Sequence, residues 1–334
     1  MSPTPHKRPP KPLIVRIRNW VGDVVLGLPA LRLLESHGYG LHIVARGKWA
    51  PALLAGYPWP VSVQPKGLHD KLLQLRALRQ QCLQQDPGFT RRENALLLPV
   101  SFSSALEMRL AGLRAVGVGK EGRSPLLARA EPMAAEGHEL TRYFDVARRF
   151  LRVRVEPPPS IDFQLAAHKD DEAAALLAAA GIVGDFVMVC PFAGGRAATV
   201  DKADKKWPAF AEFTRLAPER LGLPLVVYPG PGEHAEARER YPAARMLEGA
   251  DLAVFAALLQ RAVLVIANDT GPAHMAAALG RPVISVLGPT IAERWAPWGP
   301  GVSVLQGPAL ALGHAWPAVE DGLALAQKKL AGHD

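Results

Sequence analysis

The chain has 334 residues, 49% of them hydrophobic, and a net charge of +8. This length suits two α/β domains rather than one, and so much apolar content excludes a disordered chain. No apolar run approaches the roughly 20 residues of a membrane-spanning helix, and the basic, proline-rich start lacks the apolar stretch of a secretory signal. The two cysteines, Cys82 and Cys190, have no neighbours at metal-ligand spacing, so we expect no metal and a cytoplasmic location.

The charge is unevenly distributed along the chain. Residues 1–155 contain 24 Lys and Arg against 11 Asp and Glu, whereas the remainder contains 15 against 20. Either the first half has an ordinary solvated basic surface, or it meets an anionic partner such as a phosphorylated substrate or a membrane surface. No nucleic-acid motif is present, so we expect no nucleic-acid partner.

The first half has the pattern of a parallel α/β sheet. An apolar strand is predicted over residues 12–17, followed by a turn, a helix that ends at Gly38 and a strand over 41–46. Short connections in this β-α-β order indicate parallel strands. Further strands are expected near 95–99 and 115–118.

The second half repeats this pattern after a linker. Three successive prolines within residues 152–163 exclude a helix there. A helix over 170–180 and strands over 186–192 and 223–230 follow. Two α/β units of similar size predict two Rossmann-like domains that face each other across a cleft.

Asp23 is the first candidate catalytic residue. It closes the tract NWVGD (residues 19–23), which lies between the first strand and the first helix. A carboxylate there is often a simple helix cap, but it also suits a general base that takes a proton from an attacking hydroxyl. Gly22 allows a ligand to approach the backbone closely.

Two lysines precede a predicted helix in the second half. Lys205 and Lys206 stand before Trp207 and Pro208, where a helix macrodipole disfavours cations. A bound anion explains this placement, and the amides of Gly194 and Gly195 in the preceding turn are suitable phosphate donors. The alternative is a solvated lysine pair.

The segment VLVIANDTGPAHMAAALGRPVISVLGPT (263–290) is the most informative part of the chain. It is typical of a strand, a turn, a helix and a second strand. Its turn places a carboxylate, a hydroxyl and a glycine where open α/β sheets bind ligands, at a strand's carboxyl end and a helix N-terminus. These residues are Asp269, Thr270 and Gly271, with His274 inside the helix.

Two further tracts follow predicted strands. Glu233 comes after the glycine- and proline-rich turn 228–232, where a carboxylate holds ribose hydroxyls or simply starts a helix. The tract GVGKEG (117–122) matches the dinucleotide pattern G-x-G-x-x-G, but Arg-Ser-Pro follows it rather than a helix. We therefore assign 117–122 to a loop.

Three tracts together resemble glycosyltransferase family 9, the bacterial heptosyltransferases of lipopolysaccharide inner-core assembly. These are IVRIRNWVGDVVLGLPALRLL at the start, KKWP in the middle and NDTGPAHMAAALGRPVISVLGPT near the end. The NWVGD tract is similar to that of the enzymes that add the second heptose. The resemblance covers roughly residues 12–300.

The resemblance implies a GT-B fold and an inverting transfer that uses neither metal nor cofactor. The donor would typically be ADP-heptose, bound by a domain over 161–315. The acceptor would be an anionic lipid A–Kdo or heptose glycolipid, bound by the basic domain over 1–160, with peripheral contact to the cytoplasmic face of the inner membrane. A helix within 316–334 is expected to pack back toward the first domain.

The resemblance also implies site roles. Asp23 corresponds to the family's base, and Lys205 to the lysine on the donor diphosphate. Thr270 and Gly271 are expected at the diphosphate, and Glu233, Asp269 and His274 at the nucleotide and sugar. Further candidate turn contacts are Gly22, Gly194, Gly195 and Thr199.

Two other classes of function remain open. One is a transferase of the same fold with another nucleotide-sugar or acceptor, although the iron-dependent protein heptosyltransferases need more than two cysteines. The other is a non-catalytic nucleotide-sugar binding protein, against which the presence of Asp23 and Lys205 argues.

Overall fold

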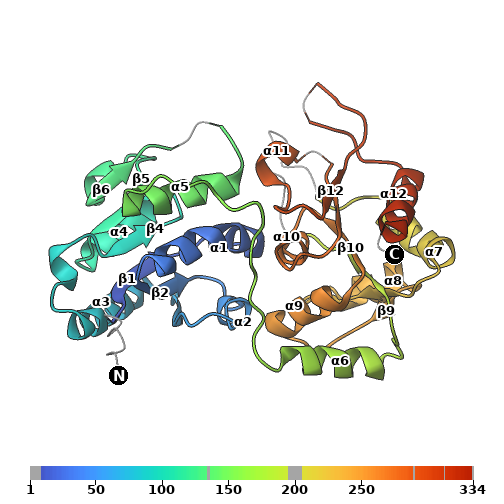
Figure 1. The fold of residues 1–334 in the computed structure, drawn as a ribbon, viewed down its shortest axis with the longest axis horizontal. Helices are drawn as coiled ribbons and strands as arrows, with labels where there is room; N and C mark the ends of the chain where they lie inside the picture. The colour runs from blue at the N-terminus through green and yellow to red at the C-terminus, as the bar shows by residue number, and fades with distance from the viewer. Residues whose placement is uncertain (1–8, 134–135, 195–204, 289, 312, 333–334) are drawn as a thin grey trace, which may run out of the picture.

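A computed structural model describes residues 9–133, 136–194, 205–288, 290–311 and 313–332. The chain forms two α/β halves, each built on one six-stranded parallel sheet (Figure 1). This confirms the fold class expected from the sequence.

The first half contains six strands and their connecting helices. In chain order these are β1 (Lys11–Arg16), α1 (Val21–Ser36), β2 (Tyr39–Ala45), α2 (Ala50–Leu53), β3 (Val61–Val63), α3 (Leu68–Gln85), β4 (Ala95–Leu97), α4 (Phe102–Leu110), β5 (Ala115–Val118), β6 (Arg129–Glu131) and α5 (Glu139–Leu151). Short 3-10 turns occur at Phe89–Arg91 and Ser124–Leu126.

The second half repeats the arrangement. Its elements are α6 (Lys169–Ala179), β7 (Val187–Cys190), α7 (Phe210–Leu221), β8 (Leu225–Val227), α8 (His234–Arg240), β9 (Arg245–Met246), α9 (Leu252–Arg261), β10 (Leu264–Asn268), α10 (Gly271–Ala278), β11 (Val283–Val286), α11 (Ala292–Trp295), β12 (Val302–Leu305) and α12 (Val319–Ala331).

Both sheets have the same topology. The strand orders are β3-β2-β1-β4-β5-β6 and β12-β11-β10-β7-β8-β9, which are the same order when each half is numbered from its own first strand. In this doubly wound order, successive strands are added first on one side of the first strand and then, from the fourth strand on, on its other side. Ligands bind at the carboxyl ends of the strands where this order reverses. The turns after β1, β7 and β10 therefore lie at the two expected binding positions.

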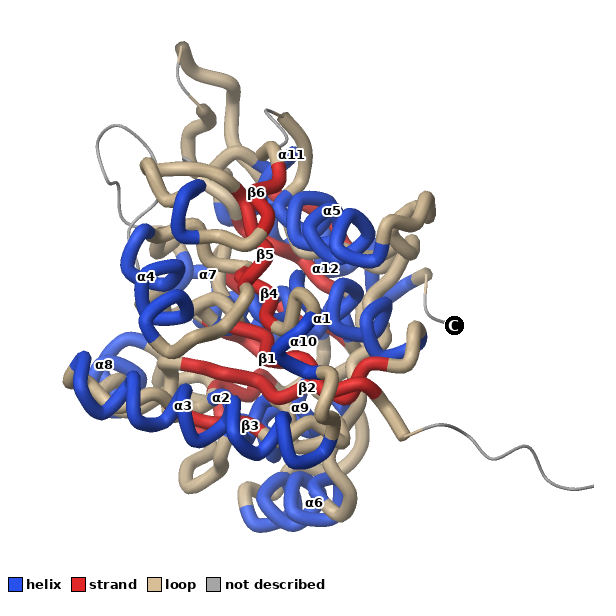
Figure 2. Tube along the Cα trace, turned by 90° about the vertical axis from the view of Figure 1, so that its left-hand side faces the viewer, coloured by secondary structure: helices blue, strands red, loops and turns tan. Residues whose placement is uncertain are grey.

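Helices cover both faces of each sheet because the strands carry apolar side chains on both faces. Along β1, Leu13 and Val15 pack into the core shared with α1 and α5, whereas Ile14 between them packs into the core beneath α3 and α4. This alternation is the two-residue period of a strand buried on both faces. Figure 2 shows α3 and α4 on one side of the first sheet and α1 and α5 on the other.

The two halves meet along α1 and α10, with a second contact between α2 and α9. The facing helices α9 and α10 are rich in buried alanine, whose small side chains allow helices to approach closely. One hydrophobic cluster runs continuously from the first sheet into the second. The halves therefore share a core where they touch.

The predicted linker has the expected irregular structure. No helix or strand interrupts residues 152–168. The Trp298 indole donates to the Pro158 carbonyl at 2.9 Å, and the Phe163 amide donates to the Ala278 carbonyl at 3.3 Å. From Pro158 onward the linker is thus hydrogen-bonded to the second half, and the Tyr57 hydroxyl of the first half also donates to the Asp162 carbonyl and accepts the Gln164 amide, both at 3.1 Å.

The expectation for the last helix is wrong. α12 packs against α7 and β10 of the second sheet, not toward the first half. Leu323 and Ala326 are buried in the second half's core, and Gly322 lies against Trp207. The apolar face of α12 has its partner on the sheet that precedes it in the chain.

The glycine-rich tract 117–122 begins with the last two residues of β5, Gly117 and Val118, so the loop prediction holds only for 119–122, and no α-helix follows directly. Its glycines accommodate Arg123, which is fully buried and donates to the carbonyls of Val118 and Pro99 at 2.7 Å. A Cβ atom at Gly117 would lie 3.1 Å from this guanidinium. The tract therefore has a packing role.

Within the described residues, no helix combines the length and the apolar character needed to span a membrane.

Candidate functional site

The site forms where the first turns of α1 and α10 meet (Figure 1). Both helices follow the carboxyl end of a strand at the centre of its sheet. A Cβ atom at Gly22 would lie 2.7 Å from the His274 ring, and one at Gly271 would lie 2.8 Å from Val21. Only glycine permits this approach, which brings the positive ends of two helix macrodipoles together.

Asp23 lies in the first turn of α1 and is 9% exposed. The Tyr143 hydroxyl, from α5, donates to its Oδ1 at 2.5 Å, and the Arg18 Nε lies 3.7 Å from the same oxygen. Burial raises the pKa of Asp23, while Arg18 and the Tyr143 hydrogen bond act in the opposite direction. A partly desolvated carboxylate with a raised pKa suits a general base.

Across the contact, a second carboxylate is held by a cation and a hydroxyl. The Lys205 Nζ donates to Asp269 Oδ2 at 2.6 Å, and the Thr290 hydroxyl donates to the same oxygen at 3.0 Å. Asp269 is 6% exposed. The charge of Lys205 also acts on Asp23 and lowers its pKa, so the lysine lies within electrostatic range of both carboxylates. The structure thus brings Asp23, Lys205 and Asp269 together, as the sequence predicts.

His274 is buried between these groups. Its Nε2 lies 3.9 Å from Asp269 Oδ1, and its Nδ1 has no hydrogen-bond partner among the described residues. Burial lowers the pKa of His274 to about 4. The imidazole is therefore neutral near pH 7 and acts as a donor or acceptor rather than as a cation.

The two lysines have different partners. Lys206 pairs with Glu236 of α8 at 2.9 Å, away from Asp269. The next helix, α7, begins only at Phe210, so the lysines lie before its first turn rather than within it. The argument from an unfavourable macrodipole is therefore wrong in detail, although Lys205 does reach the site.

Glu233 lies at the same edge of the second sheet but is not joined to this cluster. Its carboxylate accepts the Gly230 amide at 2.7 Å and so stabilises its own turn. Its charge acts on Cys190 at the end of β7. Thr270 and Gly271 occupy the start of α10, and Gly194 is exposed after β7. The predicted contacts Gly195 and Thr199 lie outside the described residues.

Sequence reasoning missed Arg18, which lies five residues before Asp23, and four further site residues. Thr290 could have been found from the sequence, because it follows β11, the neighbour of β10, at the carboxyl end of the sheet. No sequence pattern indicated Tyr143 and Glu139, because α5 reaches the site only through packing on α1. Arg294 of α11 is the fourth, and it pairs with Glu139.

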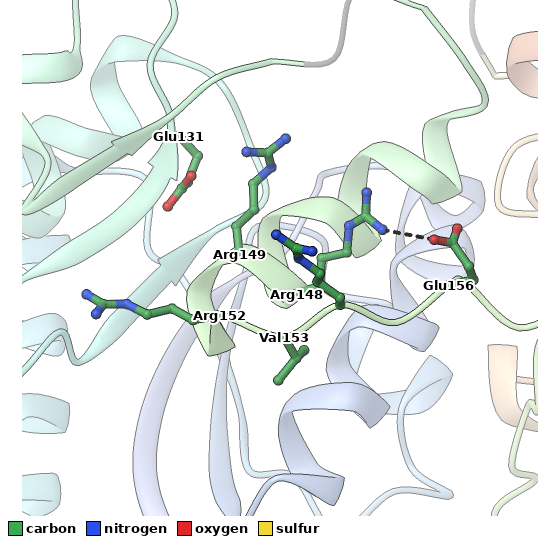
Figure 3. A pocket seen from close by; sticks show the side chains of 7 residues that line it. Glu131, Arg148, Arg149, Arg152, Val153 and Glu156 are labelled. Carbon is green, nitrogen blue, oxygen red and sulfur yellow. Dashed lines mark ion pairs between the residues drawn. The ribbon is translucent and has the colours of Figure 1, made fainter.

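A basic hollow lies at the other end of α5 (Figure 3). It is about 550 Å³ in volume and is lined by Glu131, Arg148, Arg149, Arg152, Val153, Arg154 and Glu156. Arg148 pairs with Glu156 at 3.5 Å, whereas Arg149 and Arg152 point outward and are exposed. Arg152 is nine residues beyond Tyr143, roughly 13 Å along the helix, so this hollow is separate from the site.

A sequence model of glycosyltransferase family 9 (heptosyltransferase) matches residues 89–311, which is more than half of the chain. The chain belongs to glycosyltransferase family 9. It is therefore a glycosyltransferase of the heptosyltransferase family, and its two sheets form the GT-B arrangement of such enzymes. No curated protein matches the sequence significantly.

Solved structures share the fold of this chain over most of its length. ADP-heptose LPS heptosyltransferase II of E. coli superposes with a TM-score of 0.74 at 20% identity, covering 96% of this chain and 98% of that one. A family 9 enzyme of Veillonella parvula gives 0.76 at 17% identity, covering 96% and 97%. E. coli heptosyltransferase WaaC with ADP-2-deoxy-2-fluoro heptose gives 0.65 at 21%, covering 89% and 93%.

Proposed function

We propose that this heptosyltransferase transfers heptose from ADP-heptose to an anionic inner-core acceptor of lipopolysaccharide, a lipid A–Kdo or heptose-bearing glycolipid. The single observation that carries the proposal is the placement of Asp23 beside Lys205 and Asp269 where two helix N-termini meet. A base for a sugar hydroxyl and a positive site for a diphosphate are both needed for glycosyl transfer, and they lie next to each other here.

In the proposed mechanism Asp23 takes the proton of an acceptor hydroxyl as its oxygen attacks the donor's anomeric carbon. The bond from that carbon to the diphosphate oxygen breaks on the opposite face, so the configuration inverts. Lys205 and the backbone amides at Thr270 and Gly271 stabilise the charge that develops on the leaving ADP. With these charges in place the mechanism requires no metal.

The remaining residues orient the donor. Asp269 pairs with Lys205 and so positions the lysine for the donor diphosphate. Asp269 and neutral His274 then contact the sugar or nucleotide, and Glu233 binds the ribose at the adjacent strand end. Gly22, Gly194, Gly195 and Thr199 are the proposed backbone and turn contacts.

The uneven charge of the two halves suggests which substrate each half binds. We assign acceptor binding to residues 1–160, which contain the basic excess, and donor binding to 161–315, with the C-terminal helix 316–334 attached to the donor side. A basic acceptor half suits the phosphates and carboxylates of the glycolipid. It also suits peripheral, salt-sensitive contact with the cytoplasmic face of the inner membrane.

A thermal-shift titration tests the donor. The melting temperature is measured with ADP, UDP, GDP and CMP, and then with ADP-heptose. We expect stabilisation selective for ADP and larger with ADP-heptose, because only a ligand of the native state raises the melting temperature. A preference for UDP or GDP would overturn the heptose assignment while leaving the role of Asp23 open.

A transfer assay tests the base. Asp23→Asn should fold, bind ADP like the wild type and lose transfer by a factor on the order of 10²–10⁴, the usual contribution of general base catalysis. Mass spectrometry of the acceptor measures the product. Full activity of a folded Asp23→Asn protein would refute the mechanism.

A further inference from the structure

The two oxygens of the Asp23 carboxylate have different surroundings. Oδ1 accepts the Tyr143 hydroxyl at 2.5 Å and faces Arg18 at 3.7 Å. Among the described residues, no side chain donates a hydrogen bond to Oδ2. Tyr143 is 4% exposed, so its hydroxyl cannot turn to solvent without leaving the carboxylate. The hydrogen bond therefore fixes the carboxylate's orientation and leaves Oδ2 to accept a proton.

The helix that supplies Tyr143 is tied to the opposite half of the enzyme. Glu139 lies one turn earlier on α5, four residues before Tyr143, and therefore on the same face. Its Oε1 accepts the Arg294 Nε at 2.8 Å and a guanidinium nitrogen of Arg142, on the same helix, at 3.0 Å. Arg294 belongs to α11 of the second half, so it is the partner that crosses between the halves. The neighbouring His138 contacts the Ala296 carbonyl at 2.8 Å through its Nε2. The start of α5 is thus held by the half that carries Lys205.

We propose that Tyr143 is a positioning residue that presents Oδ2 of Asp23 to the acceptor, and that the Glu139–Arg294 pair makes this positioning depend on how the two halves are arranged. The inference rests on the proposed function, because it gives Asp23 the role of base. It predicts that the base is correctly set only while α11 holds the start of α5.

Some groups around Asp23 raise its pKa and others lower it, so different variants should shift this pKa in opposite directions. Arg18 from the β1–α1 turn, Tyr143 from α5 and Lys205 from the second half each lower the pKa of Asp23, whereas Glu139 raises it. His274 of α10, which contacts Gly22, is neutral near pH 7 because burial lowers its pKa to about 4.

Three variants follow from these signs. Tyr143→Phe removes a hydrogen bond and should raise the pKa of Asp23, whereas Glu139→Gln removes a negative charge and should lower it. Arg294→Gln leaves Glu139 less neutralised and should raise it. Arg220→Gln, which breaks the exposed Arg220–Glu320 pair within the second half, is the matched control. A general loss of structure would not produce shifts of opposite sign.

The experiment titrates Asp23 directly by carboxyl carbon NMR in protein labelled at aspartate, with the Asp23 signal assigned from Asp23→Asn. We expect shifts on the order of one pH unit, upward for Tyr143→Phe and Arg294→Gln, downward for Glu139→Gln and absent for Arg220→Gln. The acid limb of the pH profile of kcat/KM for transfer should move in the same directions. Tyr143→Phe should lose up to about tenfold in kcat on the acid limb of the profile, where the raised pKa leaves more of Asp23 protonated, and should recover at higher pH.

Several results would overturn the proposal. Tyr143 would be shown to have only a packing role if the Asp23 titration were unchanged in Tyr143→Phe, or if the loss of rate were equal at every pH. In the double variant, Arg294→Gln should add nothing once Glu139 is glutamine, and full additivity would refute the link between the halves. Arg294 is 42% exposed in its side chain, so this test does not disturb the core.

The two proposals fail separately. The titration uses no substrate, so it decides the role of Tyr143 even if the enzyme transfers another sugar. If wild-type enzyme transfers no heptose while the titrations shift as expected, the proposed donor is wrong and the positioning of Asp23 stands.

Discussion

Lys205 and Lys206 are adjacent in the chain but differ in what they hold. Lys205 reaches Asp269 at 2.6 Å, and Lys206 reaches Glu236 at 2.9 Å. We expect Lys205→Met to lower kcat by a factor on the order of 10²–10³, because one well-placed charge on a leaving group is typically worth that much. Lys206→Met removes an identical charge and should stay within about tenfold of wild type. Steady-state transfer kinetics measure both, and equal losses would contradict the assignment.

His274 predicts a pH dependence of stability. Its folded-state pKa is about 4, below the ordinary value of 6.5, because burial disfavours the imidazolium. The unfolded chain therefore binds a proton at a higher pH than the native protein does. The stability from neutral His274 is complete above pH 6.5 and is lost as the pH falls toward 4. The full loss is about 3 kcal/mol.

Urea unfolding between pH 7 and pH 4 checks this expectation. His274→Gln should flatten the decline in unfolding free energy over that range, even if it is less stable at pH 7. His37→Gln, on the exposed end of α1, is the control and should decline like the wild type. A wild-type slope in His274→Gln would show that other groups control acid sensitivity.

The sequence predicted those site residues that stand in continuous motifs after strands. Asp23 and Asp269 follow strands that end at the sheet's binding edge, so local order was enough for them, whereas Lys205 was identified by the KKWP tract of the family resemblance. Tyr143 is 120 residues from its partner Asp23, and no spacing rule links them. The pairing of Lys205 with Asp269 likewise depends on how β7 and β10 lie side by side.

At the scale of elements, the meeting of α1 and α10 depends on glycine. Gly22→Ala places a Cβ atom 2.7 Å from the buried His274 ring. We expect a net loss of about 1–2 kcal/mol in unfolding free energy, because overpacking costs more than the helix propensity gained. Transfer activity should fall with it, since His274 must move.

Gly27→Ala on the same helix is the matched control. The new methyl group would lie 3.4 Å from the Leu98 side chain, which is ordinary contact. Alanine favours the helix by up to about 1 kcal/mol over glycine, so we expect equal or greater stability and unchanged activity. Thermal and urea denaturation compare the two variants. A Gly22→Ala protein as stable as Gly27→Ala would refute the tight contact.

Long or strongly apolar elements were predictable and short ones were not. The strand over 115–118 and the helix over 170–180 agree with the structure to within a residue. β3, β6 and β9 have only two or three residues and partly exposed side chains, so they carry no apolar run. The position of α12 was wrong because an amphipathic pattern shows that a helix has a partner without showing which one.

At the scale of the whole molecule, the charge asymmetry predicts salt dependence. Residues 1–155 have 24 basic against 11 acidic residues, and exposed arginines surround the hollow at the end of α5. We expect KM for the proposed glycolipid acceptor to rise steeply with ionic strength while kcat changes little, because long-range attraction is screened beyond about 8 Å at physiological salt. Transfer rates at increasing sodium chloride measure this. A KM independent of salt would contradict electrostatic capture of the acceptor.

The two-half architecture was predictable because the same β-α pattern occurs twice, separated by a proline-rich segment. What the sequence did not indicate is the extent of contact between the halves. The shared core of α1, α9 and α10 arises from alanines and valines that any buried helix contains. Pattern alone shows that these residues are buried but not that they are buried against the other half.

The position of α12 determines where the chain can be split into two separately expressed parts. Since this helix stays with the second sheet, the described chain passes from one half to the other only once, between α5 and α6. Within the described residues, each half is therefore a continuous stretch of sequence. Cutting within residues 152–157, before the linker is fastened at Pro158, should yield two separately encoded polypeptides that reassemble into a working enzyme when produced together.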